Sequence, residues 1–227
     1  TPTGSLRSVA VSGGNVYTCG SKKIEAVSRV TVWKNADVLH YSENTKQNYG
    51  TAMALSGSDI YMAGYEAGSK DIAMRWGKGG KLYTLNTGDT DASVYSIAVS
   101  GGDVYAAGTE SDEDGTKTVV KVWKNGSLLY SLSEKGSVMY GYSLAIFGDD
   151  VYTVGYDGGK EVVWKNAVLL YTLVEEGLHG EMRPLLWWRG RSNEAKICMK
   201  QPPTYGGGCF RVRTTVALRP VLFECMP

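Results

Sequence analysis

Residues 96–108 decide the fold, and they read Ser96-Ile-Ala-Val-Ser-Gly-Gly-Asp-Val-Tyr-Ala-Ala-Gly108. Apolar and small polar residues alternate before Gly101-Gly102-Asp103, and a second apolar run follows this turn at once. Period-two alternation on both sides of a Gly-Gly-Asp turn is typical of a β-hairpin. The stretch therefore predicts two short antiparallel strands.

The same pattern occurs four times, in residues 8–20, 52–64, 96–108 and 143–155. Its first turn glycine stands at positions 13, 57, 101 and 148, which are 44, 44 and 47 residues apart. Each copy continues to a tryptophan, and three of the four tryptophans are followed by Lys-Asn; the tryptophans are Trp33, Trp76, Trp123 and Trp164. Self-similarity at a fixed period indicates a repeat architecture. We divide residues 1–173 into four repeats, at about 5–48, 49–92, 93–138 and 139–173.

A second hairpin follows the first in each copy. In the third copy, Thr118–Trp123 and Leu128–Leu132 flank Asn125-Gly126, a strong signal for a type I′ turn. No window of residues 5–173 shows a sustained helical period. The predicted fold is therefore all-β, a β-propeller-like array of four four-stranded antiparallel blades. Because four blades stand at the low end of the usual range of about 4–8, we expect the array to be part of a larger ring.

The motifs resemble those of the kelch- and WD-type propeller superfamily in its broad sense. More narrowly, Ser-Gly-x-Asp-Val-Tyr-x-x-Gly and Val-Trp-Lys-Asn-Gly are similar to bacterial propeller repeats that often occur in secreted or surface proteins. The chain lacks the Gly-His and Trp-Asp pairs of WD40 repeats, and it lacks the kelch double glycine followed by spaced Tyr and Trp. The resemblance implies a propeller architecture and favours an extracellular or cell-surface location, but it implies no particular ligand.

The character of the sequence changes after Leu173. Residues 174–227 hold five of the six prolines and three of the four cysteines, and they contain no aspartate, against eleven in residues 1–173. Arg outnumbers Lys 6 to 2 in this segment, and the repeat motif does not recur. Three interpretations stand: a small extra module, a disordered extension, or a frame-shifted end of a gene whose true continuation was more blades.

The residue types that usually carry chemistry form no recognised constellation. Cys19 replaces the small apolar residues of its sister positions, and Cys198, Cys209 and Cys225 lack zinc-ligand spacing. The two histidines, His40 and His179, are far apart and outside any metal or triad motif. Gly206-Gly207-Gly208 lacks the Lys-Ser/Thr of a phosphate-binding loop. We therefore expect no catalytic residue, no metal site and no cofactor.

Other features are better explained by structure than by a site. Asp112-Glu113-Asp114-Gly115 begins like a calcium loop but lacks a ligand at its far end, so we interpret it as a solvated loop. The recurring Asx residues are expected to cap the backbone N–H groups of their own turn; they are Asn15, Asp59, Asp103 and Asp150. The repeat tryptophans are expected to pack between blades. Trp187-Trp188, beside Arg189 and Arg191, is a candidate interaction patch.

Composition limits the function. A net charge of +1 argues against a nucleic-acid partner, and no stretch has the length of a membrane helix. The preferred hypothesis is a non-enzymatic binding or scaffold propeller, with a protein or glycan ligand on loops 65–71, 109–117 and 156–160. One alternative is a fragment of a propeller hydrolase or lyase whose site lies on missing blades. Another is a lectin with one carbohydrate site per blade.

Overall fold

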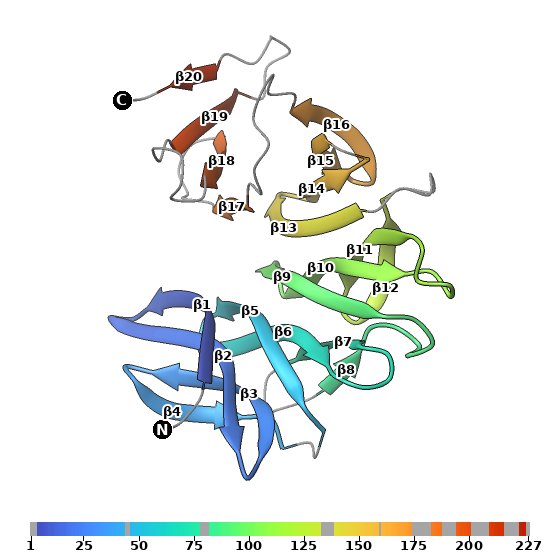
Figure 1. Ribbon diagram of the computed structural model, residues 1–227. Coiled ribbons are helices and arrows are strands. Elements are labelled where there is room, and N and C mark those ends of the chain that lie inside the picture. Colours follow the sequence, from blue (N-terminus) through green and yellow to red (C-terminus); the bar gives the residue numbers. More distant parts are fainter. Residues whose placement is uncertain are drawn as a thin grey trace.

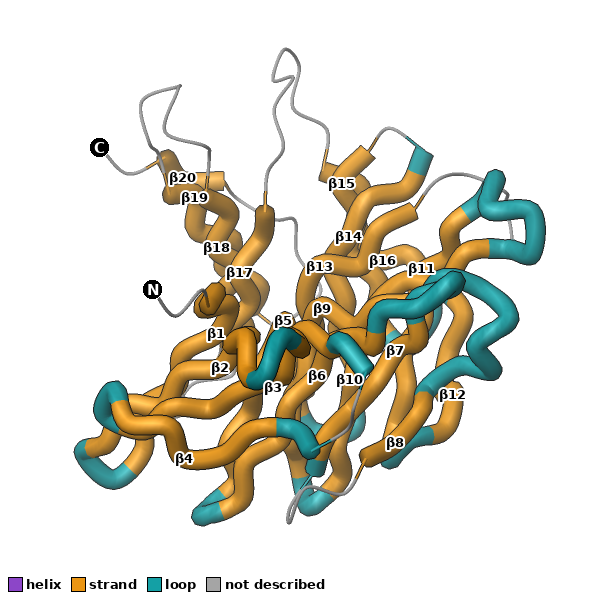
Figure 2. The backbone as a smooth tube through the Cα atoms, turned by 60° about the horizontal axis from the view of Figure 1, so that its bottom comes forward, coloured by secondary structure: helices purple, strands orange, loops and turns teal. Residues whose placement is uncertain are grey.

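Figure 1 shows the computed structural model of the chain. It describes residues 4–43, 46–77, 82–132, 139–158, 160–173, 183–187, 194–200, 209–215 and 223–225. Within these ranges every regular element is a strand (Figure 2), and no helix is long and apolar enough to cross a membrane. The prediction of an all-β chain is confirmed.

The strands group into sheets of four. In chain order they are β1 (Gly4–Ser12), β2 (Asn15–Ile24), β3 (Val27–Lys34), β4 (Asp37–Tyr41), β5 (Asn48–Ser56), β6 (Asp59–Glu66), β7 (Ile72–Trp76), β8 (Leu82–Thr84), β9 (Ala92–Ser100), β10 (Asp103–Ser111), β11 (Thr118–Lys124), β12 (Ser127–Ser131), β13 (Met139–Phe147), β14 (Asp150–Asp157), β15 (Lys160–Lys165), β16 (Val168–Leu173), β17 (Arg183–Trp187), β18 (Glu194–Lys200), β19 (Cys209–Thr215) and β20 (Phe223–Cys225).

Each sheet is an antiparallel meander in which consecutive strands pair, so each of the four repeats forms one blade of a propeller-type fold. The first strands of successive sheets lie side by side in the order β1, β5, β9, β13 and β17. The sheets therefore follow one another along an arc (Figure 1). We call these sheets blades 1 to 4 and the fifth sheet.

The fifth sheet was not predicted. Its strands β17 to β20 lie in the segment without repeat motifs, yet they pair in the same sequential order as a blade. Strand β17 lies beside β13, as β13 lies beside β9. The domain organisation of residues 174–227 stays a prediction.

The turns follow the sequence closely. Asn125 and Gly126 both have positive φ angles, 53° and 93°, as a type I′ turn requires. In blade 1 the corresponding turn holds Asn35 and Ala36 at 50° and 76°. The Asn residue adopts this left-handed conformation more easily than most residues, which explains its recurrence after Trp-Lys.

The prediction that the recurring Asx side chains cap their own turns is wrong for blades 3 and 4, where Asp103 and Asp150 bond to the other turn of the blade, whereas Asn15 Nδ2 also donates to the Gly13 carbonyl oxygen of its own turn at 3.1 Å. In blade 3, Asn125 Nδ2 donates to Asp103 Oδ1 at 2.7 Å, and the Val104 amide donates to Asn125 Oδ1 at 2.9 Å. Lys124 Nζ lies 2.8 Å from Asp103 Oδ2 and over the Tyr105 ring. The Asx residue therefore ties the first hairpin to the second, because the Lys-Asn pair that reaches it belongs to the other turn.

Part of this bonding between the two turns of a blade recurs in blades 1 and 4. Asn166 Nδ2 donates to Asp150 Oδ1 at 2.7 Å in blade 4, and Asn35 Nδ2 donates to Asn15 Oδ1 at 2.8 Å in blade 1. Lys165 pairs with Asp150 at 2.8 Å. The motif Asp-Val-Tyr and the motif Trp-Lys-Asn are thus two halves of one local structure. Their recurrence has a structural cause and does not mark repeated binding sites.

The core lies between the blades. Each of three apolar clusters joins one blade to the next, and each contains the tryptophan of the following blade: Trp76, Trp123 and Trp164. We call the side of a blade that faces the preceding blade its front face, and the opposite side its back face. The tryptophans belong to front faces. The prediction that they pack between blades holds for blades 2, 3 and 4.

One position of blade 4 departs from this apolar pattern and gives a testable result. Glu161 stands where the other blades have Val30, Ala73 and Val120, all fully buried. Burial raises the pKa of Glu161 to about 7. A folded-state pKa above the unfolded value destabilises the fold as pH rises from about 4.5 to about 7, and the loss stays constant above that range.

We therefore expect Glu161→Gln to stabilise the chain at pH 8 and to leave its stability nearly unchanged at pH 4. Because the side chain is only half-buried, solvent reduces the gain to about 1–2 kcal/mol. Urea unfolding at the two pH values measures it. An equal gain at both would show that the carboxylate charge is not the cause.

Candidate functional site

The first strand of every blade contains a β-bulge near the same end. The register between first and second strand shifts at this point in each blade, so one residue has no partner across the ladder. These residues are Arg7, Thr51, Tyr95 and Tyr142. A bulge re-aims its side chain and is common beside functional sites. The bulged residue is Arg in blade 1, Thr in blade 2 and Tyr in blades 3 and 4, so the residue type at this position varies among the blades.

A close approach of backbone explains the glycine opposite each bulge. A Cβ atom on Gly20, Gly64 or Gly108 would lie 1.8, 1.8 or 2.0 Å from a carbonyl oxygen of the first strand. No real Cβ contact is that short. Gly20, Gly64 and Gly108 end the second-strand motif of blades 1 to 3 and are therefore required by the bulge, which sets the direction of the residue at its centre.

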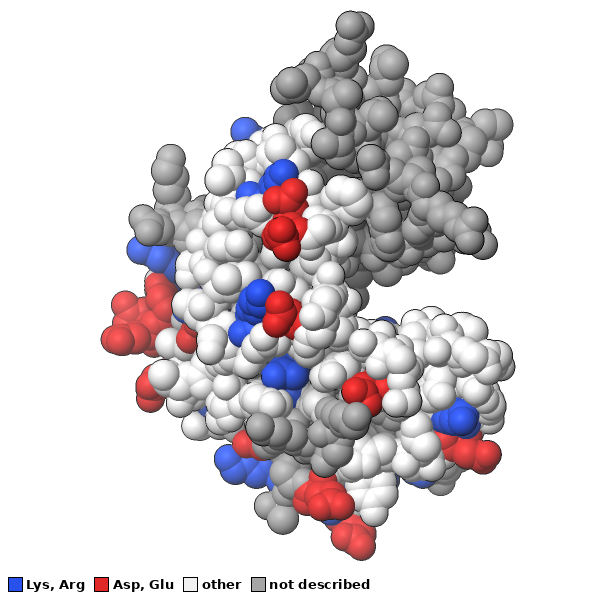
Figure 3. Space-filling model, turned by 180° about the vertical axis from the view of Figure 1, so that it is seen from behind, with Lys and Arg blue, Asp and Glu red and all other residues white. Residues whose placement is uncertain are grey.

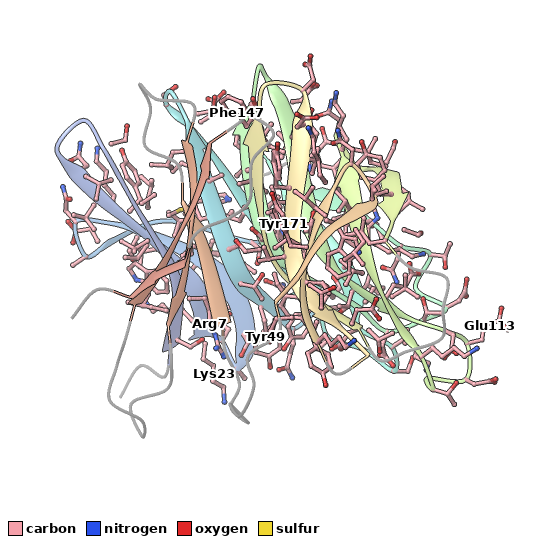
Figure 4. The ribbon with its side chains drawn as sticks, turned by 90° about the horizontal axis from the view of Figure 1, so that it is seen from above. Arg7, Lys23, Tyr49, Glu113, Phe147 and Tyr171 are labelled. Atoms are coloured by element: carbon pink, nitrogen blue, oxygen red, sulfur yellow. The ribbon has the colours of Figure 1, made fainter. Side chains whose placement is uncertain are left out.

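Aromatic side chains gather at this end. The rings of Tyr49 and Tyr65 stack with centroids 5.2 Å apart and an interplanar angle of 27°. Figure 4 shows Arg7 and Tyr49 at the same end of the molecule, opposite Phe147. Arg7 is exposed, and Tyr95 is 39% exposed. We call the group Arg7, Tyr49, Tyr65, Asp71 and Tyr95 the tyrosine cluster; it draws on blades 1, 2 and 3.

The other members of the tyrosine cluster influence the pKa of Tyr65. The pKa of Tyr65 is raised, first by burial and then by the charges of Asp71, Tyr49 and Tyr95, and the Arg7 guanidinium opposes the rise. Thr51 Oγ1 lies 3.0 Å from the Ala63 carbonyl oxygen and 2.5 Å from that of Val94 in the next blade. Thr51 therefore holds the blades together, whereas Arg7 and Tyr95 face solvent.

A pair of carboxylates borders the cluster. The Asp71 amide donates to Asp91 Oδ1 at 2.8 Å, and Lys70 Nζ lies 3.4 Å from Asp91 Oδ2. Burial raises the pKa of the Asp71 carboxyl most, and the nearby Asp91 adds to it, against a lowering hydrogen bond from Gly68. Perturbed pKa values cluster at functional sites, so the raised pKa of Asp71 makes this border a candidate for ligand binding.

The cluster offers two kinds of contact. Tyrosine rings present apolar faces and hydroxyl groups, and a guanidinium pairs with a carboxylate. The described residues contain no group of three His, Cys, Asp or Glu side chains placed to hold a metal ion. On the face seen in Figure 3, acidic and basic side chains lie next to one another and form no large patch of one sign.

The residues weighed from the sequence lie elsewhere. Cys19 is fully buried in the core, and burial raises the pKa of its thiol to about 12, so it is not a reactive thiolate. His40 is half-buried in β4. Cys198, Cys209 and Cys225 lie in strands of the fifth sheet whose side chains are outside the described set, as are His179, Trp188 and the Gly206–Gly208 run.

The acidic loop of blade 3 is ordered by its own hydrogen bonds. Asp112 Oδ1 accepts from the amides of Thr116 and Lys117 at 2.8 and 3.1 Å, and Asp112 Oδ2 accepts from Thr116 Oγ1 at 3.0 Å. These bonds, with the Lys117 amide contributing most, lower the pKa of Asp112. Figure 4 places Glu113 of this loop far out from the first strands, but at the end that carries Arg7.

The tryptophans of blades 2 to 4 are not a sugar-binding surface. Trp76, Trp123 and Trp164 are 1–2% exposed, so none of them presents a ring face to a ligand. A lectin site in each blade that relied on these rings is therefore not supported. The tyrosine cluster was missed in the sequence because the search followed residues that repeat. The signal lay in the bulge position itself, which holds Arg, Thr, Tyr and Tyr in the four copies.

No protein-family model matches the chain, and no curated protein matches its sequence significantly. The chain does resemble solved structures. One comes from a structural and mechanistic analysis of two prolyl endopeptidases, with a TM-score of 0.54 and 11% identity over 98% of this chain and 35% of that chain. A GH43 endo-arabinanase from Bacillus licheniformis has a TM-score of 0.46 and 8% identity, and the match covers 92% of this chain and 93% of that chain. Prolyl oligopeptidase B from Galerina marginata has a TM-score of 0.48 and 10% identity, and the match covers 92% of this chain and 33% of that chain.

These likenesses concern the fold, which is of the propeller type. The chain spans about a third of the length of the prolyl endopeptidase that it matches. The prediction that the chain is not an enzyme is contradicted, because the chain shares its fold with part of a prolyl endopeptidase structure. The lack of a catalytic constellation in the repeats gave no ground for excluding catalysis, since catalytic groups of one enzyme can come from parts of the protein far apart in sequence.

Proposed function

We propose that this chain is the propeller part of a larger hydrolase and that its tyrosine cluster contacts the substrate. The observation that carries the proposal is the cluster itself, where Arg7, Tyr95 and the stacked Tyr49 and Tyr65 converge from three blades. The prolyl endopeptidase structures support it, because the chain aligns with about a third of such an enzyme. The reacting groups would then come from the remainder of the protein.

A peptide is the substrate class that this chemistry fits best. Tyrosine rings pack against apolar and ring-shaped side chains such as proline, and their hydroxyl groups bond to peptide carbonyls. The Arg7 guanidinium is suited to a carboxylate, either a side chain or a chain terminus. The prolyl endopeptidases that share the fold are described in terms of inter-domain dynamics in catalysis and specificity, which is a role open to a propeller that faces a second domain.

Hydrolysis of proline-containing chromogenic peptides by the longer polypeptide that carries this chain tests the proposal. We expect cleavage, and we expect Arg7→Ala to raise KM for a peptide with a free carboxylate by about tenfold, the effect of losing one charged contact of about 1.4 kcal/mol. The same peptide with an amidated end should show a smaller change.

The matched control is Asp149→Asn, because Asp149 is an exposed residue in the turn after Phe147, at the opposite end of the molecule (Figure 4). It should leave KM unchanged. Cleavage of arabinan instead of peptides would contradict the substrate class. An Arg7→Ala variant with unaltered KM for every cleaved peptide would remove the tyrosine cluster from the proposal.

A further inference from the structure

The front face of blade 1 is an exposed apolar surface. Val9, Val11 and Val16 are 66%, 69% and 44% exposed, and Trp33 is half-buried. The strand register pairs Val11 with Val16, Val9 with Thr18, and Thr18 with Trp33, so the side chains form one continuous stripe across β1, β2 and β3. A contiguous apolar patch of this kind indicates an interaction surface.

The same positions are buried in blade 4. Leu144, Val151 and Trp164 are 4%, 3% and 2% exposed, and they correspond to Val9, Val16 and Trp33. The back face of blade 3 covers them, with the side chains of Tyr105, Ala107, Val120, Val122 and Leu132. Burial of this stripe is therefore the ordinary state of a blade in this array, and blade 1 is the exception.

The two front faces are chemically almost the same. Blade 1 and blade 4 share Val, Thr and Trp at three of the five stripe positions, and at the other two they differ only in the size of an aliphatic side chain. The pairs are Val9 and Leu144, Val11 and Ile146, Val16 and Val151, Thr18 and Thr153, and Trp33 and Trp164. A surface that covers the stripe of blade 4 therefore fits the stripe of blade 1.

We infer that the front face of blade 1 binds the back face of a further blade of this repeat, which precedes Gly4 in the ring. The interfaces within the chain also define a polar contact for that blade. The Met53 amide donates to Ser8 Oγ at 3.2 Å, and the Leu144 amide donates to Ser96 Oγ at 3.1 Å. Val9 is the sister of Met53 and Leu144, so its amide is expected to face a serine of the incoming blade.

Two other partners for the front face of blade 1, the fifth sheet and a second copy of the chain, fit less well than a further blade. The fifth sheet lies beside β13, at the far end of the arc (Figure 1), and the exposure of Val9 and Val11 persists in its presence. A second copy of the chain related by a two-fold axis would bring front face against front face. The three interfaces within the chain all join a front face to a back face.

The test adds one blade and asks whether it covers Val9. A copy of residues 93–138 is joined directly to Gly4, because Met139, which follows that segment in the chain, holds the repeat position of Gly4. The probe is Val9→Cys in a Cys19→Ala background, where alanine is the residue of the sister positions 63 and 107. Maleimide labelling of residue 9 is followed by mass spectrometry of its peptide, in the fused and unfused chains.

We expect labelling to slow by at least about tenfold in the fusion, since a covered thiol reacts only when the interface opens. The control fusion carries Val120→Asp and Val122→Asp in the added copy, and there labelling should stay as fast as in the unfused chain. Equal rates in the two fusions, including the case in which the added blade does not fold, would overturn the inference. So would labelling of the unfused chain that slows with concentration as a dimer forms.

Discussion

Replacing Gly108 by alanine should abolish folding of the chain or cost more than about 4 kcal/mol of its stability. The added Cβ would lie 2.0 Å from the Ser93 carbonyl oxygen and 2.8 Å from the Val94 Cα atom. Both are backbone atoms of the adjacent strand in the ladder, so no side-chain movement relieves the clash. The bulge at Tyr95 would have to open. Circular dichroism and urea unfolding measure the effect.

The matched control is Gly102→Ala, in the turn that leads into the same strand. Gly102 has a φ angle of +87°, and no heavy atom lies within 4 Å of the position that an added methyl group would take. Alanine there costs only the backbone strain, about 1 kcal/mol. Both substitutions add one methyl group to a glycine of the same hairpin. If the two variants lose equal stability, the close approach at the bulge is not what requires Gly108.

Replacing Trp123 by alanine should cost about 3–5 kcal/mol, the usual penalty for removing a buried aromatic side chain and leaving a cavity. Trp123 is 1% exposed and packs against blade 2, in a cluster that includes Ala63 and Val94. The substitution therefore weakens the contact between two blades as well as the interior of one. Urea unfolding at neutral pH gives the difference in free energy.

Trp33→Ala is the internal comparison, because Trp33 occupies the same repeat position in blade 1 and is only half-buried. We expect it to cost about 1 kcal/mol or less in this chain. A loss as large as that of Trp123→Ala would mean that the recurring tryptophan stabilises its own blade instead of the interface between blades. In the fusion with an added blade, the cost of Trp33→Ala should rise toward that of Trp123→Ala.

Much of the local structure was predictable because its causes are local. Alternation around Gly101-Gly102-Asp103 predicted the hairpin of β9 and β10, and Asn125-Gly126 predicted the turn between β11 and β12. Turn residues act through their own φ and ψ preferences, which need no tertiary contact. The fifth sheet escaped prediction because β17 to β20 lack these repeated turn signals.

The candidate site could not be predicted from sequence motifs. Arg7, Tyr65 and Tyr95 lie far apart in the sequence, and only the succession of blades brings them to one end. The roles of the recurring polar residues were also assigned wrongly. Asp103 bonds to Asn125, 22 residues away, and not to its own turn, because the antiparallel register places the two turns next to each other.

The sequence by itself determined that the chain is all-β, where its repeated hairpins begin and end, and that its tryptophans serve packing in blades 2 to 4. Periodicity and turn chemistry are properties of neighbouring residues, so they can be read in one dimension. The tertiary structure decided which blade faces are covered, why Gly108 must lack a side chain, and which residues meet at the bulges. These depend on contacts between residues a whole repeat apart. The same stripe of Val, Thr and Trp is therefore buried in blade 4 and exposed in blade 1.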